Sequence, residues 1–209
     1  MRRLIIGGFI LSTMLSSMAQ ADEQNRNLKD FKTIIARGAY SIVIEVGKPY
    51  SVKVSGTDKF LTEVTTEVVA DELILNSKEK RNLKINDHNI VTISLPELSK
   101  FKMEGVGGTT INKLQGDKFV LQYEGVGKLV ANGKVNSLRL KAKGVGTVDT
   151  RDLIAENVEA SLEGVGSVTV FAKENLNASV QGIGSLTYYG KPRSVSKAVD
   201  GIGSVRAAE

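Results

Sequence analysis

The chain has 209 residues, of which 28 are Lys or Arg, 23 are Asp or Glu and one is His, a length that fits one domain or one array of repeats. The absence of Cys excludes disulfides, thiolate metal sites and a Cys nucleophile, and the single His excludes a His cluster. A hydrophobic share of 41% argues against wholesale disorder, and the 21 Gly residues are the main clue to the fold.

Residues 1–21 have the pattern of a secretory signal peptide. Two arginines precede a mostly apolar run, Leu4–Leu15, which is followed by the small-x-small motif Ala19–Ala21. The pattern predicts export by the Sec route, with cleavage between Ala21 and Asp22, and therefore a periplasmic, secreted or cell-surface protein. The apolar run is shorter than the roughly 20 residues that span a bilayer, so we expect no membrane span in the mature chain.

The charge of the mature chain is modest. Removing the two arginines takes the 28 basic residues to 26, against 23 acidic ones. No basic run is interleaved with aromatic residues, so we expect no nucleic-acid partner.

We interpret residues 22–30, after the predicted signal peptide, as an N-terminal lead-in that is followed by strands. Period-two apolar patterns predict strands at Leu73–Leu75 and Val91–Leu95, and the polar stretch Ser77–Asn89 between them predicts a protruding loop. No helical periodicity follows the signal.

The second half repeats with a period of about nineteen residues. Gly-Val-Gly or Gly-Ile-Gly occurs six times, with first glycines spaced by 20, 19, 20, 18 and 19 residues. Near-constant spacing of this size is typical of a solenoid. We interpret the glycines as structural corner residues: Gly105, Gly107, Gly125, Gly127, Gly144, Gly146, Gly164, Gly166, Gly182, Gly184, Gly201 and Gly203.

The apolar positions around each motif suggest how one coil is built. Counted from the first Gly, positions −6, −4 and −2 alternate as in a half-buried strand, for example Leu138, Leu140 and Ala142. Position +1 is always Val or Ile, whereas the next apolar position is +4. We interpret this as a change of side-chain phase, which requires a turn at both glycines and a buried Val or Ile between them. The pattern predicts an all-β fold, a right-handed parallel β-solenoid (β-helix) with coils of about 19 residues, as one domain over 31–209.

Several segments resemble the GIN-domain family of autotransporter adhesin head domains. They are Phe31-Lys32-Thr33-Ile34, Gly38, Ser41–Ile44, Val52–Gly56, Leu61, Val64, Asp71–Leu75 and the recurrent Gly-Val/Ile-Gly-Ser rungs. The similarity extends from about Leu28 to Val205. It implies an exported β-solenoid in the bacterial cell envelope, and it implies no catalytic residues.

Two classes of function remain open. The first is a non-enzymatic binding or structural module with an unknown protein or glycan ligand. The second is a polysaccharide lyase or hydrolase that uses stacked surface carboxylates, because Glu104 and Glu124 on adjacent coils would lie about 5 Å apart, the separation of a retaining pair. We favour the first, a non-enzyme, because the outward column at position −1 mixes charges: Glu104, Glu124, Lys143, Glu163, Gln181 and Asp200.

Other polar residues offer little chemistry. His88 lies in a polar turn, Ser185 and Ser204 follow corner glycines with no base nearby, and Tyr189 is a single outward aromatic. We therefore expect no catalytic residue, cofactor or metal. The last coil lacks an evident cap, which favours a homo-oligomer through that end.

Overall fold

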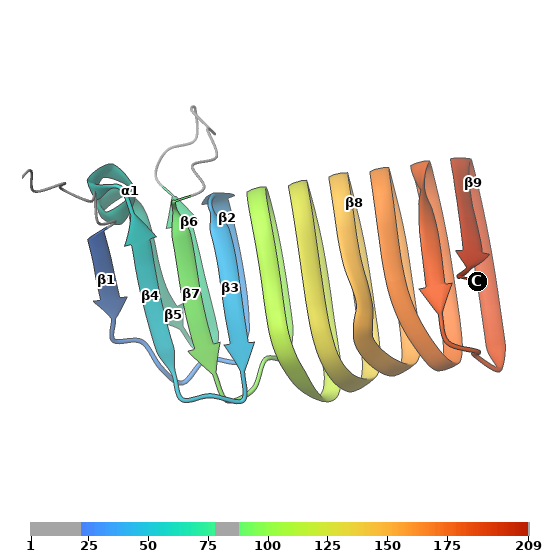
Figure 1. Ribbon diagram of the computed structural model, residues 1–209, viewed down its shortest axis with the longest axis horizontal. Coiled ribbons are helices and arrows are strands. Elements are labelled where there is room, and N and C mark those ends of the chain that lie inside the picture. The colour runs from blue at the N-terminus through green and yellow to red at the C-terminus, as the bar shows by residue number, and fades with distance from the viewer. Residues whose placement is uncertain (1–21, 78–87, 209) are drawn as a thin grey trace, which may run out of the picture.

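The computed structural model describes residues 22–77 and 88–208, which form strands and one short helix, α1 (Asp58–Glu63). Most of the C-terminal half is a single continuous strand that winds around the long axis of the molecule (Figure 1). The strands are β1 (Asp22–Arg26), β2 (Thr33–Ala39), β3 (Ser41–Val46), β4 (Ser51–Gly56), β5 (Val64–Val69), β6 (Glu72–Ser77), β7 (Ile90–Leu95), β8 (Lys100–Tyr189) and β9 (Ser194–Ala207).

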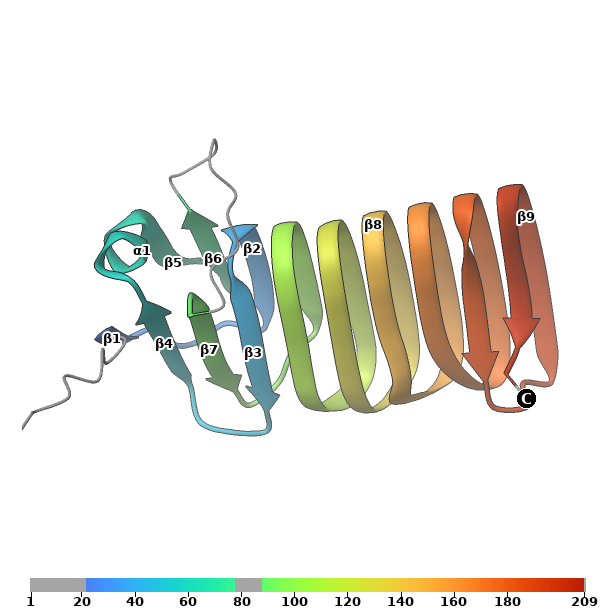
Figure 2. The ribbon, with the colours of Figure 1, turned by 45° about the horizontal axis from the view of Figure 1, so that its top comes forward.

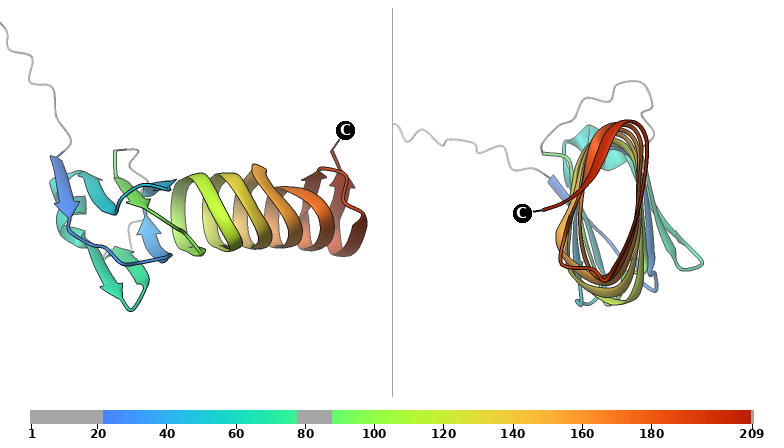
Figure 3. Two further views of the ribbon diagram at one scale, coloured as in Figure 1. Left: turned by 90° about the horizontal axis from the view of Figure 1, so that it is seen from below. Right: turned by 90° about the vertical axis from the view of Figure 1, so that its right-hand side faces the viewer.

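All nine strands belong to one sheet, in the order β1-β4-β7-β3-β8-β2-β6-β5, with β9 paired to β8. The sheet curls around a single apolar core into a nearly closed, barrel-like wall, whose flattened outline is visible along the long axis (Figure 3). Short strands form one end, and the windings of β8 continue from them toward β9 (Figure 2). A winding here means one passage of the chain around the long axis.

The predicted fold class, a right-handed parallel β-solenoid over 31–209, is wrong. The sheet is mixed, because β4 pairs antiparallel with both β1 and β7, and β5 pairs antiparallel with β6. The prediction extended the glycine period of the second half to the whole chain. The first half lacks that period, and there the chain returns on itself in tight connections such as the one between β5 and β6, where Ala70 has φ 57°.

The predictions of individual elements in the first half are partly confirmed. The strands expected at Leu73–Leu75 and Val91–Leu95 are confirmed as β6 and β7, which pair in parallel with β2 and β3. The expected absence of helix is wrong at α1, where the Thr57 hydroxyl caps the first turn by accepting a hydrogen bond from the Phe60 amide at 3.2 Å. Most of the loop predicted at Ser77–Asn89 and the whole signal segment lie outside the described residues.

The core is a column of inward side chains that follows the strand alternation. In β8 the positions predicted to be inward before the glycine motifs are buried, including Phe119, Leu121 and Tyr123 in one winding and Leu138, Leu140 and Ala142 in the next. The equivalent residues of β9, Val195 and Val199, are exposed. β8 and β9 stay in register from Asn175↔Ser194 to Tyr188↔Ala207, which keeps each apolar position over the same position of the neighbouring winding. No helix within the described residues is long and apolar enough to cross a membrane.

Candidate binding surface

The strand passes through each Gly-x-Gly segment without a change of side-chain phase. Leu140 and Ala142 point inward before the motif and Val148 points inward after it, and the two glycines take the alternate positions between them, where Gly144 is exposed and Gly146 half-buried. Val145, between the glycines, therefore points outward. The phase changes twice later in the winding instead, at the consecutive exposed residues Arg151 and Asp152 and again at Glu156 and Asn157.

Glycine is required at these two positions because neighbouring windings approach closely. At Gly146, with φ 155°, a Cβ would lie 2.1 Å from the carbonyl oxygen of Gly127 in the previous winding. Gly144 stacks in the same way on Gly125, where a Cβ would lie 2.2 Å from the carbonyl oxygen. Stacked glycines leave the residue between them in register with its equivalents along the molecule.

The predicted burial of the central Val or Ile is wrong, because five of these six residues are exposed. The prediction took apolar character as evidence of an inward position, although the alternation from Ala142 to Val148 places Val145 outward. We call the exposed column the apolar ridge: Val126 (49% exposed), Val145 (51%), Val165 (46%), Ile183 (55%) and Ile202 (77%). The sixth equivalent, Val106, is half-buried. Contiguous exposed apolar side chains are typical of interaction sites.

Charged side chains beside the ridge form ion pairs, within one winding or between neighbouring strands. The Glu104 carboxylate contacts the Lys102 ammonium and lies 2.8 Å from the Arg37 guanidinium. Glu163 lies 2.6 Å from Lys141 and 3.2 Å from Lys143. The interleaving of opposite charges inferred from the sequence is thus present as ion pairs.

These pairs set the protonation of both carboxylates. A hydrogen bond from Lys102, reinforced by Arg37, lowers the pKa of Glu104, and hydrogen bonds from Lys141 and Lys143 lower the pKa of Glu163. A general acid for glycoside cleavage needs a raised pKa, so Glu104 has the opposite tuning. Within the described residues, no three His, Cys, Asp or Glu side chains are grouped so as to hold a metal ion.

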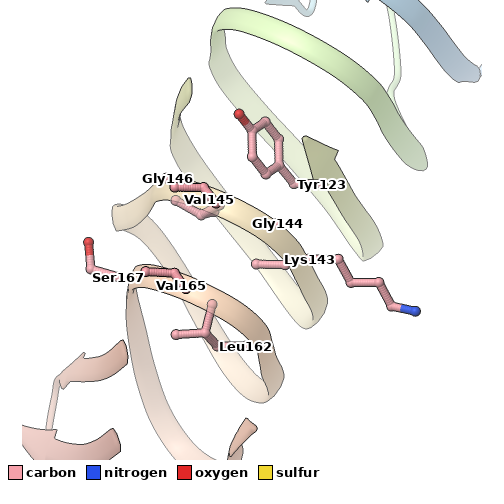
Figure 4. A pocket seen from close by; sticks show the side chains of 10 residues that line it. Tyr123, Lys143, Gly144, Val145, Gly146, Leu162, Val165 and Ser167 are labelled. Carbon is pink, nitrogen blue, oxygen red and sulfur yellow. The ribbon is translucent and has the colours of Figure 1, made fainter. Parts of the chain in front are cut away.

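A small cavity lies under the ridge, between Tyr123, the Gly144–Gly146 segment and Leu162 (Figure 4). Its volume is about 10 Å³. That is room for about one water molecule, not for a sugar. The Tyr123 hydroxyl is buried without a hydrogen-bond partner among the described residues, and burial raises its pKa.

An open hollow of about 270 Å³ lies elsewhere on the wall, between Gln115-Gly116 and Lys134–Asn136. No carboxylate lines it, so it lacks an acid and a base for hydrolysis.

The remaining candidate residues are spread over the molecule. His88 is exposed in a turn, and Ser185 and Ser204 are half-buried beside the ridge. The Tyr189 ring has the Arg151 guanidinium over one face, 5.7 Å from its centroid, which leaves less of that face for stacking on a sugar. The structure brings none of these residues together with Glu104.

The fold is thus an all-β wall with an exposed apolar column and ion pairs beside it. The chain belongs to the family described as "Putative auto-transporter adhesin, head GIN domain", whose model matches residues 30–192. The resemblance drawn from the sequence is thereby confirmed.

Solved structures agree with this assignment. A protein described as a putative adhesin from Bacteroides fragilis NCTC 9343 is 26% identical, with a TM-score of 0.72 over 91% of this chain and 98% of that one. A putative adhesin from Parabacteroides merdae ATCC 43184, 18% identical with a TM-score of 0.52 over 91% and 97% of the two chains, shares the fold. No curated protein matches the chain.

Proposed function

We propose that the chain is an exported, non-enzymatic binding module of the bacterial cell envelope that engages its ligand through the apolar ridge. The observation that carries the proposal is the exposure of five aligned Val and Ile side chains on one side of the wall. Leaving such side chains in water has a cost of about 25 cal/mol per Å² of apolar surface, which a bound partner would remove.

The pairing of the neighbouring charges supports a binding role over a catalytic one. Carboxylates held by Lys and Arg, as Glu104 and Glu163 are, remain ionised and offer no proton to a leaving group. We expect no cleavage when the purified protein is incubated, with calcium, with a panel of acidic and neutral polysaccharides. Cleavage by the unaltered chain that is lost in Glu104→Gln or Glu124→Gln would show instead that the protein is an enzyme.

Binding is tested with two valines of similar exposure. Val145 lies on the ridge at 51% exposure, and Val69 lies at the end of β5 at 54% exposure. Co-sedimentation of the mature chain with isolated cell-envelope fractions should be lost in Val145→Asp and kept in Val69→Asp. Equal retention of both variants, or no binding by the unaltered chain, would contradict the proposal.

Export is the second part of the proposal. The adhesin family supports a surface or extracellular location. N-terminal sequencing of the protein from the producing cell should begin at Asp22. A chain that retains Met1 in the cytoplasmic fraction would contradict the predicted cleavage after Ala21.

A further inference from the structure

The apolar ridge has a geometry that suits one partner in particular. We propose that it packs against the ridge of a second copy of this chain, the two molecules lying side by side and antiparallel across a twofold axis. This inference rests on the proposed function, since it names the partner of the same surface.

The first argument is the spacing of the side chains. The ridge carries one Val or Ile per winding, which we call a rung. The rungs therefore repeat at the inter-strand distance of about 4.8 Å. A second copy has the same repeat by construction, so its rungs meet these rungs one to one along the whole row. Matched rows of apolar side chains on stacked strands can exclude water between them.

The second argument is the charge beside the ridge. Lys143 and Glu163 each lie two residues before a ridge valine, Val145 and Val165, and the strand alternation places them on the same outward side. A twofold axis between these two windings sets Val145 opposite Val165 of the second copy. It then brings Lys143 of each molecule opposite Glu163 of the other, which extends the Lys143–Glu163 pair of each chain into one network across the axis.

The ridge suits a second copy better than an anionic lipid surface. Glu124, Glu163 and Asp200 all stand in the column adjoining the ridge and would be drawn against lipid phosphates. Opposite the same column of a second copy, in the register above, Glu124 faces the uncharged Gln181 and Glu163 faces Lys143. Glu104 faces Asp200, and the Arg37 and Lys102 side chains that pair with Glu104 offset this contact between like charges.

End-to-end stacking on β9, the association expected from the sequence, is less suitable. The inward position that is Leu140 or Ala178 in earlier windings is Lys197 in β9. Its ammonium lies 4.9 Å from the centroid of the Tyr188 ring and donates to the Val205 carbonyl at 3.4 Å. A copy stacked on β9 would bury this charge, which is unfavourable without an acidic partner.

Sedimentation velocity over a micromolar to millimolar range tests the association. We expect the unaltered mature chain to dimerise reversibly, Val145→Asp to weaken the dimer by about tenfold or more, and Val69→Asp to leave it unchanged. A chain that is monomeric throughout the range, or a dimer indifferent to Val145→Asp, would overturn the proposal. Thermal unfolding of each variant establishes that it is folded.

Charge exchange tests the register. Lys143→Glu and Glu163→Lys should each self-associate more weakly than the unaltered chain, and an equimolar mixture of the two should form a heterodimer. A mixture that associates no better than its components overturns the antiparallel arrangement.

The outcome is separable from that of the proposed function. A monomer whose envelope binding depends on Val145 would refute the dimer and leave the binding role standing. A ridge-dependent dimer that binds no envelope fraction would do the reverse.

Discussion

Two buried tyrosines differ in the hydrogen bonding of their hydroxyl groups. The Tyr40 hydroxyl lies 3.3 Å from the Leu75 carbonyl and 3.4 Å from the Arg37 carbonyl, to which it can donate. The Tyr123 hydroxyl, inside the wall under the glycine segments, has no hydrogen-bond partner among the described residues. Burial raises the pKa of both phenols, so both stay protonated, and the difference between them is one of hydrogen bonding.

Removing the two hydroxyls should have opposite effects on stability. Tyr123→Phe deletes a buried polar atom without a partner, and we expect the free energy of unfolding to rise by about 1 kcal/mol. Tyr40→Phe deletes a bonded hydroxyl and leaves carbonyl groups unsatisfied, and we expect a loss of about 1 kcal/mol. Urea unfolding measures both variants, and changes of the same sign would contradict this account.

Glycine at the stacked positions is a steric requirement that one methyl group can test. In Gly146→Ala the new Cβ would lie 2.1 Å from backbone at φ 155°, whereas at Gly108 the nearest atom, the Ser41 hydroxyl oxygen, is 3.6 Å away. We expect Gly146→Ala to lower the free energy of unfolding by roughly 3 kcal/mol and Gly108→Ala to change it by less than about 0.5 kcal/mol. Similar melting temperatures for the two variants would show that the windings can separate at low cost.

At the scale of elements, the alternation of apolar and polar residues predicted the direction of side chains correctly where neighbouring residues differ in polarity. Leu138, Leu140 and Val148 were placed inward correctly because each is followed by an outward, mostly polar residue. Val145 was placed incorrectly, because an apolar residue between two glycines looks like a core residue when glycine has no side chain to mark the inward face. The phase change at Arg151-Asp152 is the signal that could have resolved this, since two adjacent exposed charges break the alternation there.

The short elements of the first half were harder to predict. β1 and β4 pair antiparallel over residues far apart in sequence, and no local motif encodes that choice. The helix α1 is six residues long, too short for a periodic pattern, although Thr57-Asp58 is a recognisable N-cap sequence.

Ion pairs between windings should make stability depend on acid. The pKa of Glu163 is lowered in the folded state from its ordinary value of 4.5, so its pairs with Lys141 and Lys143 contribute above that pH. Their contribution is lost as the pH falls through the lowered folded-state value. We expect the unaltered chain to lose stability below about pH 4.5 more steeply than Glu163→Gln does.

Exposed Glu67 on β5 provides the control for this acid dependence. Glu67→Gln should follow the unaltered chain in melting temperature from neutral pH to pH 3 or so. If the stability of Glu163→Gln and that of the unaltered chain fall equally with pH, the ion pairs contribute nothing to the stability of the fold.

At the scale of the whole molecule, the family and the all-β class followed from motifs that recur along the chain, but the closure of the sheet did not. The antiparallel pairs lie at the two ends of the strand order, whereas the strands between them pair in parallel, and no recurring motif marks where that change occurs. The apolar ridge could not be predicted from the sequence for a related reason. The ridge exists only because stacked glycines align one residue per winding, and alignment is a property of the assembled wall.

The outward position of the ridge is the claim on which the binding role depends, and the unfolding free energy of Val145→Asp tests it most directly. An outward carboxylate at a half-exposed site should change the free energy of unfolding by less than about 1 kcal/mol, whereas Leu140→Asp, in the same winding but fully inward, should prevent folding or lower it by several kcal/mol. Comparable losses in the two variants would place Val145 in the core and contradict the account.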